Sequence, residues 1–326
     1  MTETQWTQFN MLKESYKRYV DALSRALPQL PRLLTDLIGG RAGPSYPLET
    51  PVVYNSALDD VQKESTIKLI LVADNPGRRE QSAAERRYLV GPSGKLADNF
   101  FKQHPELNID FRQHVLILNK TPIHTPRTID LRDLARLGGD NLAEAIRNSQ
   151  IYMARLIYRC HQIFAREAEL WIIGYSEMGR GKLFEAFTEE IRALYTGQTP
   201  ADLSAGADLT PTPLSAGAGL AVSVASTGAA SAALSDVAAG AALSAPPALA
   251  APANIASPTA LATPANVAAP PALAENSISS QKVYLYRHFS MNQFSVDFSK
   301  QKKPEDSTQE TLHRIGSQYR KCILGW

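Results

Sequence analysis

Residues 67–77, Ile-Lys-Leu-Ile-Leu-Val-Ala-Asp-Asn-Pro-Gly, decide the fold class of this 326-residue chain. An apolar run ends directly in a polar Pro-Gly turn, which is typical of a buried strand that leads into a loop. Three further short apolar runs occupy residues 115–119, 170–174 and 283–286. Patterns with helical spacing lie at about residues 94–103, 140–167, 180–195 and 306–323. This alternation predicts an α/β fold, a three-layer α/β/α sandwich around a four-stranded parallel sheet.

Composition divides the chain into three parts. We predict an N-terminal helical segment at 1–50, because apolar positions recur there at helical spacing as far as Leu37 before a loop rich in Gly and Pro. One domain is expected from 51–195 and 282–326. The segment between its two pieces, 196–281, is rich in Ala, Pro and Ser and has no aromatic residue. Such a segment cannot bury enough apolar surface to offset the entropy lost on ordering, so we expect a disordered insertion before the last strand.

Charge and apolar content narrow the possible partners and surroundings. The whole chain carries +2, but without the four acids of the insertion 34 basic and 28 acidic side chains remain, a net +6 that favours an anionic partner. No stretch has the roughly 18 strongly apolar residues of a membrane span, and the N-terminus lacks the pattern of a secretory signal. Cys160 and Cys322 are too few for a disulfide scaffold or a cysteine-ligated cluster. We therefore expect a cytoplasmic monomer with no membrane partner and no cofactor or metal.

Polar side chains follow the predicted strands. Asp74 and Asn75 come after the first strand, Asn119 ends the second, and His288 follows the fourth. In open parallel sheets, ligands bind beyond the carboxyl ends of the strands. These carboxylate, amide and imidazole groups are therefore predicted to converge at one edge of the sheet.

The same residues resemble the motifs of the uracil-DNA glycosylase superfamily. Its first motif is matched by residues 71–77 together with residues 89–96, Leu-Val-Gly-Pro-Ser-Gly-Lys-Leu. Its second motif, a strand ending in Asn, is matched at Asn119, and its His-Pro-Ser-like turn is matched by His288-Phe289-Ser290. The layout is similar to that of the bacterial iron–sulfur branch, although that branch ligates its cluster with four cysteines and this chain has two.

The resemblance implies a monofunctional DNA glycosylase that removes uracil or a related deaminated base in base excision repair. Its catalytic residues would be His288, which stabilises the departing base, and either Asn75 or Asp74, which holds the attacking water. The Asn-Pro-Gly turn favours Asn75 for the water, and the iron–sulfur branch favours Asp74. For base binding it implies that Asn119 reads the edge of the base. Leu89 and the adjacent Tyr88 stand where that branch carries a stacking Phe.

Basic loops and a helix start are candidates for binding DNA phosphates. Ser93, Gly94 and Lys95 open a predicted helix, and Arg78 and Arg87 precede it. Two alternatives remain open. A non-catalytic nucleic-acid- or nucleotide-binding relative with the same fold is favoured by Leu89 at the stacking position and by the altered turn after His288. A hydrolase of free nucleosides is disfavoured by the basic loops.

Overall fold

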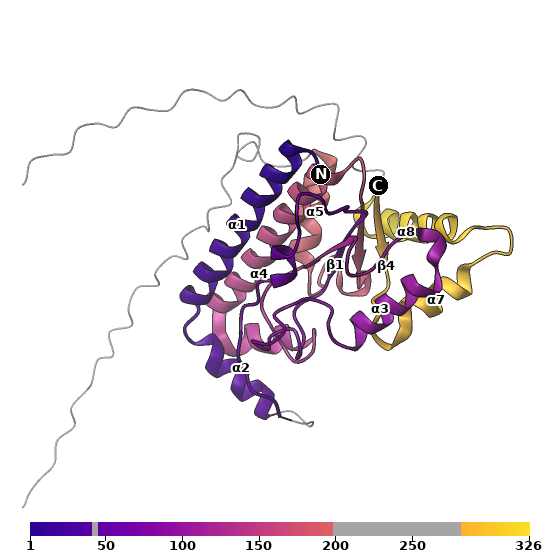
Figure 1. The fold of residues 1–326 in the computed structure, drawn as a ribbon. Helices are drawn as coiled ribbons and strands as arrows, with labels where there is room; N and C mark the ends of the chain where they lie inside the picture. Colours follow the sequence, from indigo (N-terminus) through magenta and orange to yellow (C-terminus); the bar gives the residue numbers. More distant parts are fainter. Residues whose placement is uncertain (41–44, 198–281) are drawn as a thin grey trace, which may run out of the picture. The chain divides into compact units, whose positions relative to one another are not determined.

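The computed structural model describes residues 1–40, 45–197 and 282–326, and nearly all of the predicted insertion lies outside these residues. Four parallel strands form a single sheet in the order β2-β1-β3-β4 (Figure 1). The strands are β1 (Leu69–Ala73), β2 (Val115–Asn119), β3 (Glu169–Ile173) and β4 (Val283–Tyr286). This confirms the predicted α/β class and its four-stranded parallel sheet.

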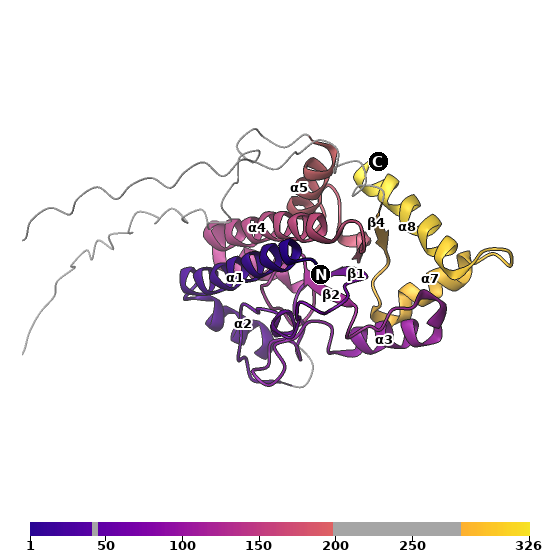
Figure 2. The ribbon, with the colours of Figure 1, turned by 45° about the horizontal axis from the view of Figure 1, so that its top comes forward.

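Helices pack on both faces of the sheet (Figures 1 and 2). One layer contains α1 (Glu3–Ala26), α2 (Leu30–Gly39), α4 (Asp130–Phe164) and α5 (Glu185–Thr196). The other layer contains α3 (Pro92–Gln103), α7 (Gln293–Gln301) and α8 (Thr308–Leu324). Within the described ranges, no helix combines the length and the apolar character needed to cross a membrane.

Alternation along each strand divides the interior into two cores. Successive strand side chains point to opposite faces, so in β1 Ile70 and Val72 pack with the layer of α1, α4 and α5. Leu69 and Leu71 pack with the layer of α3, α7 and α8. Both faces of the sheet are buried, which explains why the strands are almost continuously apolar.

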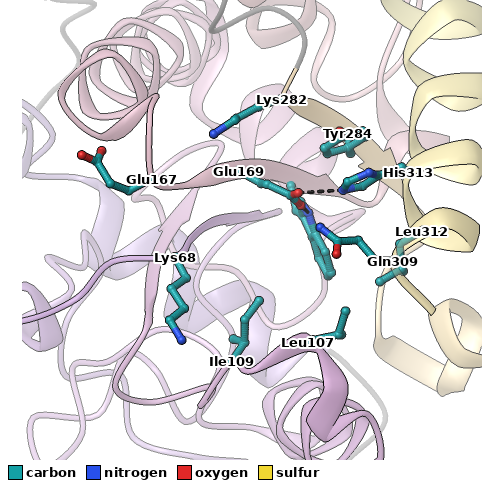
Figure 3. Close-up of a pocket in the computed structure, with 11 residues that line it drawn as sticks. Lys68, Leu107, Ile109, Glu167, Glu169, Lys282, Tyr284, Gln309, Leu312 and His313 are labelled. Carbon is teal, nitrogen blue, oxygen red and sulfur yellow. Dashed lines mark hydrogen bonds and ion pairs between the residues drawn. The ribbon is translucent and has the colours of Figure 1, made fainter. Parts of the chain in front are cut away.

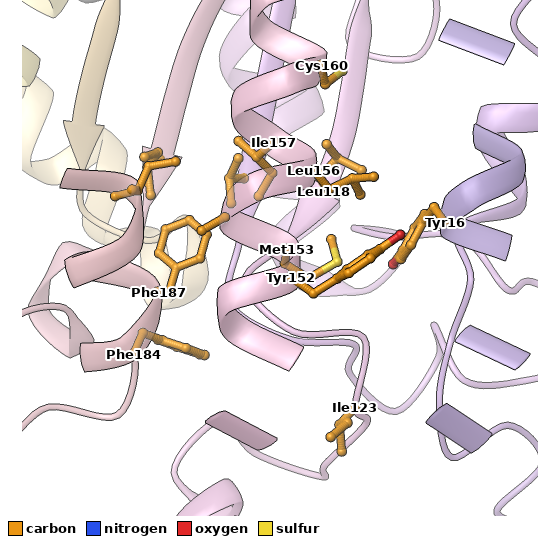
Figure 4. Packing of buried hydrophobic residues seen from close by; sticks show 14 of the residues in the cluster. Tyr16, Leu118, Ile123, Tyr152, Met153, Leu156, Ile157, Cys160, Phe184 and Phe187 are labelled. Carbon is orange, nitrogen blue, oxygen red and sulfur yellow. The ribbon is translucent and has the colours of Figure 1, made fainter. Parts of the chain in front are cut away.

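The N-terminal helix is part of the first core rather than a separate segment. Figure 4 shows Tyr16 of α1 beside Tyr152 of α4, and their rings stack with centroids 6.5 Å apart. Leu118 of β2, together with Ile157 of α4 and Phe187 of α5, belongs to the same buried cluster. Residues 1–40 therefore contribute two helices, α1 and α2, to one layer of the domain that we predicted from residue 51 onward.

Two helical features differ from the sequence-based prediction. The predicted helix at 140–167 is preceded by a further helical stretch from Asp130, and a kink at Gly139 (φ +67°) joins the two. The pair of glycines before residue 140 hid this earlier stretch. The short helix α7 was not predicted, because its apolar pattern consists of little more than the two buried side chains Phe294 and Phe298.

Candidate active site

The carboxyl ends of the strands bring Asp74, Lys120 and His288 together. Ala73 pairs with Asn119 in the β1–β2 register, so the next residues, Asp74 and Lys120, lie side by side at the sheet edge. His288 follows β4 by two residues, and its ring is close enough to Asp74 and Lys120 for both charges to shift its pKa.

Lys120 and Asp74 form a buried ion pair. Lys120 Nζ donates to Asp74 Oδ1 at 2.5 Å and to the Ile173 carbonyl oxygen at 2.6 Å. The Lys120 side chain is fully buried, and this burial lowers its pKa against the opposing charge of Asp74. Gly174 lies close to the same carboxylate, since a Cβ at this residue (φ +81°) would come within 2.5 Å of Asp74 Oδ1 and 3.1 Å of Oδ2. The ammonium and a residue without a side chain thus both border the carboxylate.

The hydrogen bonds of His288 define its protonation. The Ser290 backbone N–H donates to His288 Nδ1 at 3.0 Å, and the Ser290 hydroxyl lies 2.8 Å from the same nitrogen. A ring nitrogen that accepts a hydrogen bond from an amide N–H carries no proton of its own. The neutral ring therefore has its proton on Nε2. Burial lowers the His288 pKa, the charge of Lys120 lowers it further, and Asp74 acts in the opposite direction. His288 is therefore a neutral imidazole with a donor at Nε2.

The two predicted asparagines have different surroundings. Asn75 Nδ2 donates to Thr125 Oγ1 at 2.8 Å and to the Ile123 carbonyl oxygen at 3.3 Å, which ties the turn after β1 to the loop after β2. Asn119 is 1% exposed, and within the described part of the chain neither its Nδ2 nor its Oδ1 has a hydrogen-bond partner. An unpaired buried polar group costs about 1–3 kcal/mol. A ligand with a complementary donor and acceptor would remove that cost.

A second histidine supports the turn after β1. His124 Nδ1 lies 2.8 Å from the Pro76 carbonyl oxygen, which can only accept, so Nδ1 carries the proton. His124 Nε2 then accepts from the Tyr46 hydroxyl at 2.8 Å. Burial lowers the His124 pKa to about 4, which keeps the ring neutral at pH 7. Tyr46 and His124 hold the turn that carries Asn75.

Lys120 and Tyr46 belong to this edge of the sheet but were not among the predicted site residues. A signal for Lys120 was available, since it follows Asn119 directly and so shares strand parity with Asp74. No local signal pointed to Tyr46, which reaches His124 from a loop 78 residues away in the chain.

The structure corrects the expectation for Tyr88. Its side chain is 1% exposed and its hydroxyl donates to the Val53 carbonyl oxygen at 2.6 Å, with the Tyr16 hydroxyl 2.7 Å away. Tyr88 therefore contributes to the core and is not placed to stack on a base. Leu89 is also buried, at 3% exposure, and its backbone has φ +52°.

The predicted phosphate-binding residues differ in their exposure to solvent and in whether an acidic side chain already neutralises their charge. Ser93 is half-buried, Gly94 is buried and Lys95 is exposed in the first turn of α3. Arg78 is exposed, with its guanidinium 4.8 Å from the centre of the Tyr46 ring. Arg87 forms an exposed ion pair with Asp60. Lys95 and Arg78 are therefore better placed than Arg87 to attract an anion.

A cavity of about 400 Å³ lies at the opposite, amino-terminal edge of the sheet (Figure 3). Its central polar groups are paired with one another, since His313 Nε2 lies 2.7 Å from Glu169 Oε1 and Trp171 Nε1 donates to Glu169 Oε2 at 2.8 Å. The His313 ring also stacks on Tyr284, with centroids 4.6 Å apart. These satisfied contacts point to a structural role, and the candidate active site remains at the carboxyl edge.

Comparison with known proteins supplies no relative from which roles could be transferred. No family model matches the chain, and no curated protein or solved structure matches it. Among the described residues, no three or more His, Cys, Asp or Glu side chains are grouped in a way that could hold a metal ion.

Proposed function

We propose that this protein is a DNA glycosylase-like hydrolase that removes uracil or a related deaminated base by hydrolysing the N-glycosidic bond. One observation carries the proposal. Asp74, a neutral His288 and the unpaired amide of Asn119 occupy the carboxyl edge of a single parallel sheet. These groups supply an acceptor for water, a donor for a leaving group and a polar surface for recognising a base.

His288 supplies the donor that the departing base requires. When the N-glycosidic bond breaks, the bonding electrons leave with the base and water forms the new bond to the sugar carbon. The proton that this water loses neutralises the base anion, so the products are the free base and an abasic sugar. A neutral imidazole with its proton on Nε2 can donate to the oxygen on which the negative charge develops. One preorganised donor of this kind contributes about 3–4 kcal/mol to transition-state stabilisation.

Asp74 is better placed than Asn75 to hold the attacking water. Its Oδ1 is occupied by Lys120, which leaves Oδ2 as an acceptor, and its charge is near enough to His288 to act on the pKa of that ring. The amide nitrogen of Asn75 is instead engaged with the loop after β2. The motif Asn-Pro-Gly favoured Asn75, but these contacts favour Asp74 for the water and Asn75 for fixing the turn.

Asn119 and Met291 would act on the base and on the DNA. The amide of Asn119 offers both a donor and an acceptor, and in one orientation the two match the edge of uracil. Met291 is 83% exposed and follows the His288 turn, and it and Asn292 have φ values of +51° and +57°. An apolar side chain held outward in this way could fill the space left by an extruded base, which itself costs a few kcal/mol to unstack.

The direct test is a single-turnover assay on oligonucleotides that contain one uracil or one other deaminated base, followed by alkaline cleavage of abasic sites. We expect cleavage by the parent protein, a large loss in Asp74→Asn and a smaller loss in Asn75→Ala. His114→Ala serves as a control, because His114 precedes β2 at the opposite edge of the sheet. A larger loss in Asn75→Ala than in Asp74→Asn would show that Asn75 holds the attacking water. No cleavage by the parent protein would refute the proposal that it is an enzyme.

The burial of the site favours a second candidate. Asn119 and Lys120 are at most 1% exposed and Asp74 is 8% exposed, so a base could reach them only if the surrounding loops move. A relative that binds nucleic acid without turnover would tolerate such a closed site. Binding of deaminated DNA by the parent, with no abasic product after prolonged incubation, would support this candidate over the enzyme.

A further inference from the structure

The ion pair between Lys120 and Asp74 is not explained by stability. Removing two charges from water costs several kcal/mol for each ion, and well-packed apolar residues of similar size are often as stable as a buried pair. Lys120 directly follows β2 and lies in the interior among Phe184, Ile173 and Asp74. A hydrophobic side chain would fill the same space. The presence of a charged side chain at this position therefore needs an explanation other than stability.

We propose that Lys120 is a positioning residue, which holds the Asp74 carboxylate ionised and turns its Oδ2 toward the attacking water. The proposal rests on the function proposed above. Lys120 Nζ occupies Oδ1, and the backbone at Gly174 lies directly against the same carboxylate, where a Cβ would come within 2.5 Å of Oδ1. The Ile173 carbonyl oxygen accepts a second hydrogen bond from the ammonium, which fixes the direction from which Lys120 approaches.

Few other charged groups act on this pair. Glu177, in the short helix after β3 (Tyr175–Glu177), attracts the Lys120 ammonium electrostatically. His288, after β4, is the remaining titratable neighbour, and it responds to both Lys120 and Asp74. The Phe184 ring lies 4.9 Å from Lys120 Nζ. Loss of the ammonium would thus leave Asp74 without a contacting cation in this part of the described structure.

The consequence is a change in the pH dependence of the rate. A buried carboxylate without its counter-charge favours the protonated form, which cannot accept a hydrogen bond from water in the same way. In Lys120→Met, which keeps a long apolar side chain, the acid limb of the single-turnover rate should therefore move to higher pH. At a pH on that limb the rate should fall at least about tenfold, which corresponds to a displacement of one pH unit. At alkaline pH the rate should approach that of the parent.

The experiment compares the full-length parent with Lys120→Met, Asp74→Asn and the double variant, and uses Lys102→Met as a control. Lys102 is an exposed lysine paired with Asp98, so its loss should alter neither measurement. Single-turnover rates on a deaminated substrate are measured from pH 5 to pH 9. A rate that falls by the same factor at every pH in Lys120→Met would overturn the proposal, because it would indicate a structural role only.

A thermal-unfolding cycle on the same four proteins keeps this test separate from the proposed function. We expect Lys120→Met to lower the unfolding temperature at pH 8. The double variant, which also carries Asp74→Asn, should recover part of that loss because the unpaired charge is gone. Additive losses would show that the two side chains do not act as a pair, which contradicts the proposal. If the parent has no turnover, the proposed function fails, while the unfolding cycle still decides whether Lys120 and Asp74 act as a pair.

Discussion

His288 and His124 are two neutral histidines at the same edge of the sheet, and they hold their protons on opposite nitrogens. The backbone N–H of Ser290 donates to Nδ1 of His288, whereas Nδ1 of His124 donates to the carbonyl oxygen of Pro76. The backbone group facing the ring thus selects the tautomer. His288 keeps its Nε2 proton for a ligand, and His124 uses both nitrogens to brace a turn.

The role of His288 predicts a specific kinetic pattern. We expect His288→Ala to reduce the single-turnover rate about a hundredfold or more, the scale for loss of a preorganised donor. Binding to DNA with an abasic site should change little, because the base oxyanion is absent from the product. Fluorescence anisotropy with abasic DNA measures the second quantity. Equal losses of rate and abasic binding would show that His288 contributes to affinity and not to the transition state.

Glu80 makes the loop that carries the arginines sensitive to pH. Its buried carboxylate accepts the Gly77 N–H at 3.1 Å and the Leu89 N–H at 2.9 Å, and burial raises its pKa to about 7. Between the ordinary pKa of 4.5 and about 7, the unfolded chain has lost the proton that the folded chain retains. The stability contributed by Glu80 therefore falls as pH rises through this window and is constant above it.

This linkage can be measured with Glu80→Gln, which has no titratable group. From pH 5 to pH 8 the free energy of unfolding of the parent should fall relative to that of the variant, by at most about 3 kcal/mol. Urea denaturation at the two pH values gives the difference. Glu85→Gln, on the same loop, is the control. It removes an exposed ion pair with Arg79 and should change the free energy of unfolding little at either pH. A relative rise in parent stability with pH would show that folding does not raise the Glu80 pKa.

At the scale of elements, the first turn of α3 is fixed by its contact with the preceding loop. A Cβ at Gly94 would lie 1.5 Å from the Leu89 carbonyl oxygen, so only glycine lets the helix begin so close to that backbone. Leu89 also accepts a hydrogen bond from Arg112 Nη2 at 2.7 Å. The helix start, which carries Ser93 and Lys95, is thereby held at the end of the loop that follows β1.

Gly94→Ala should therefore destabilise the protein more than Gly91→Ala. The added methyl group overlaps backbone atoms that cannot rotate away, and overpacking of this kind costs about 1–3 kcal/mol or more. Gly91→Ala is the matched control, since a Cβ at Gly91 meets no atom within 4 Å. Chemical denaturation of both variants measures the difference. Equal stability of the two would mean that α3 can shift without cost.

At the scale of the whole molecule, the excess of basic over acidic side chains outside the predicted insertion bears on DNA binding. If Lys95 contacts a phosphate, Lys95→Ala should weaken duplex binding and reduce the slope of log affinity against log salt by about one. Lys102, two turns further along α3 and paired with Asp98, provides the control. Binding titrations between low and physiological salt measure both slopes. An unchanged slope in Lys95→Ala would remove this residue from the phosphate contacts.

The sequence by itself determined the class of the fold and the edge where the site would form. The runs at 115–119 and 283–286 match β2 and β4 residue for residue, because a strand buried on both faces is apolar over almost its whole length. Parallel strands share one carboxyl edge, so Asp74, Asn119 and His288 could be assigned to the same side of the sheet from their order alone.

Only the tertiary structure decided what these side chains do at that edge. The pairing of Lys120 with Asp74, the bracing of Pro76 by His124 and the burial of Tyr88 depend on strand register and on the paths of loops distant in sequence. A local pattern records whether a residue is polar or apolar, but not which partner reaches it. Hydrogen bonds and ion pairs form only between atoms brought within about 3 Å, and the fold alone sets those distances.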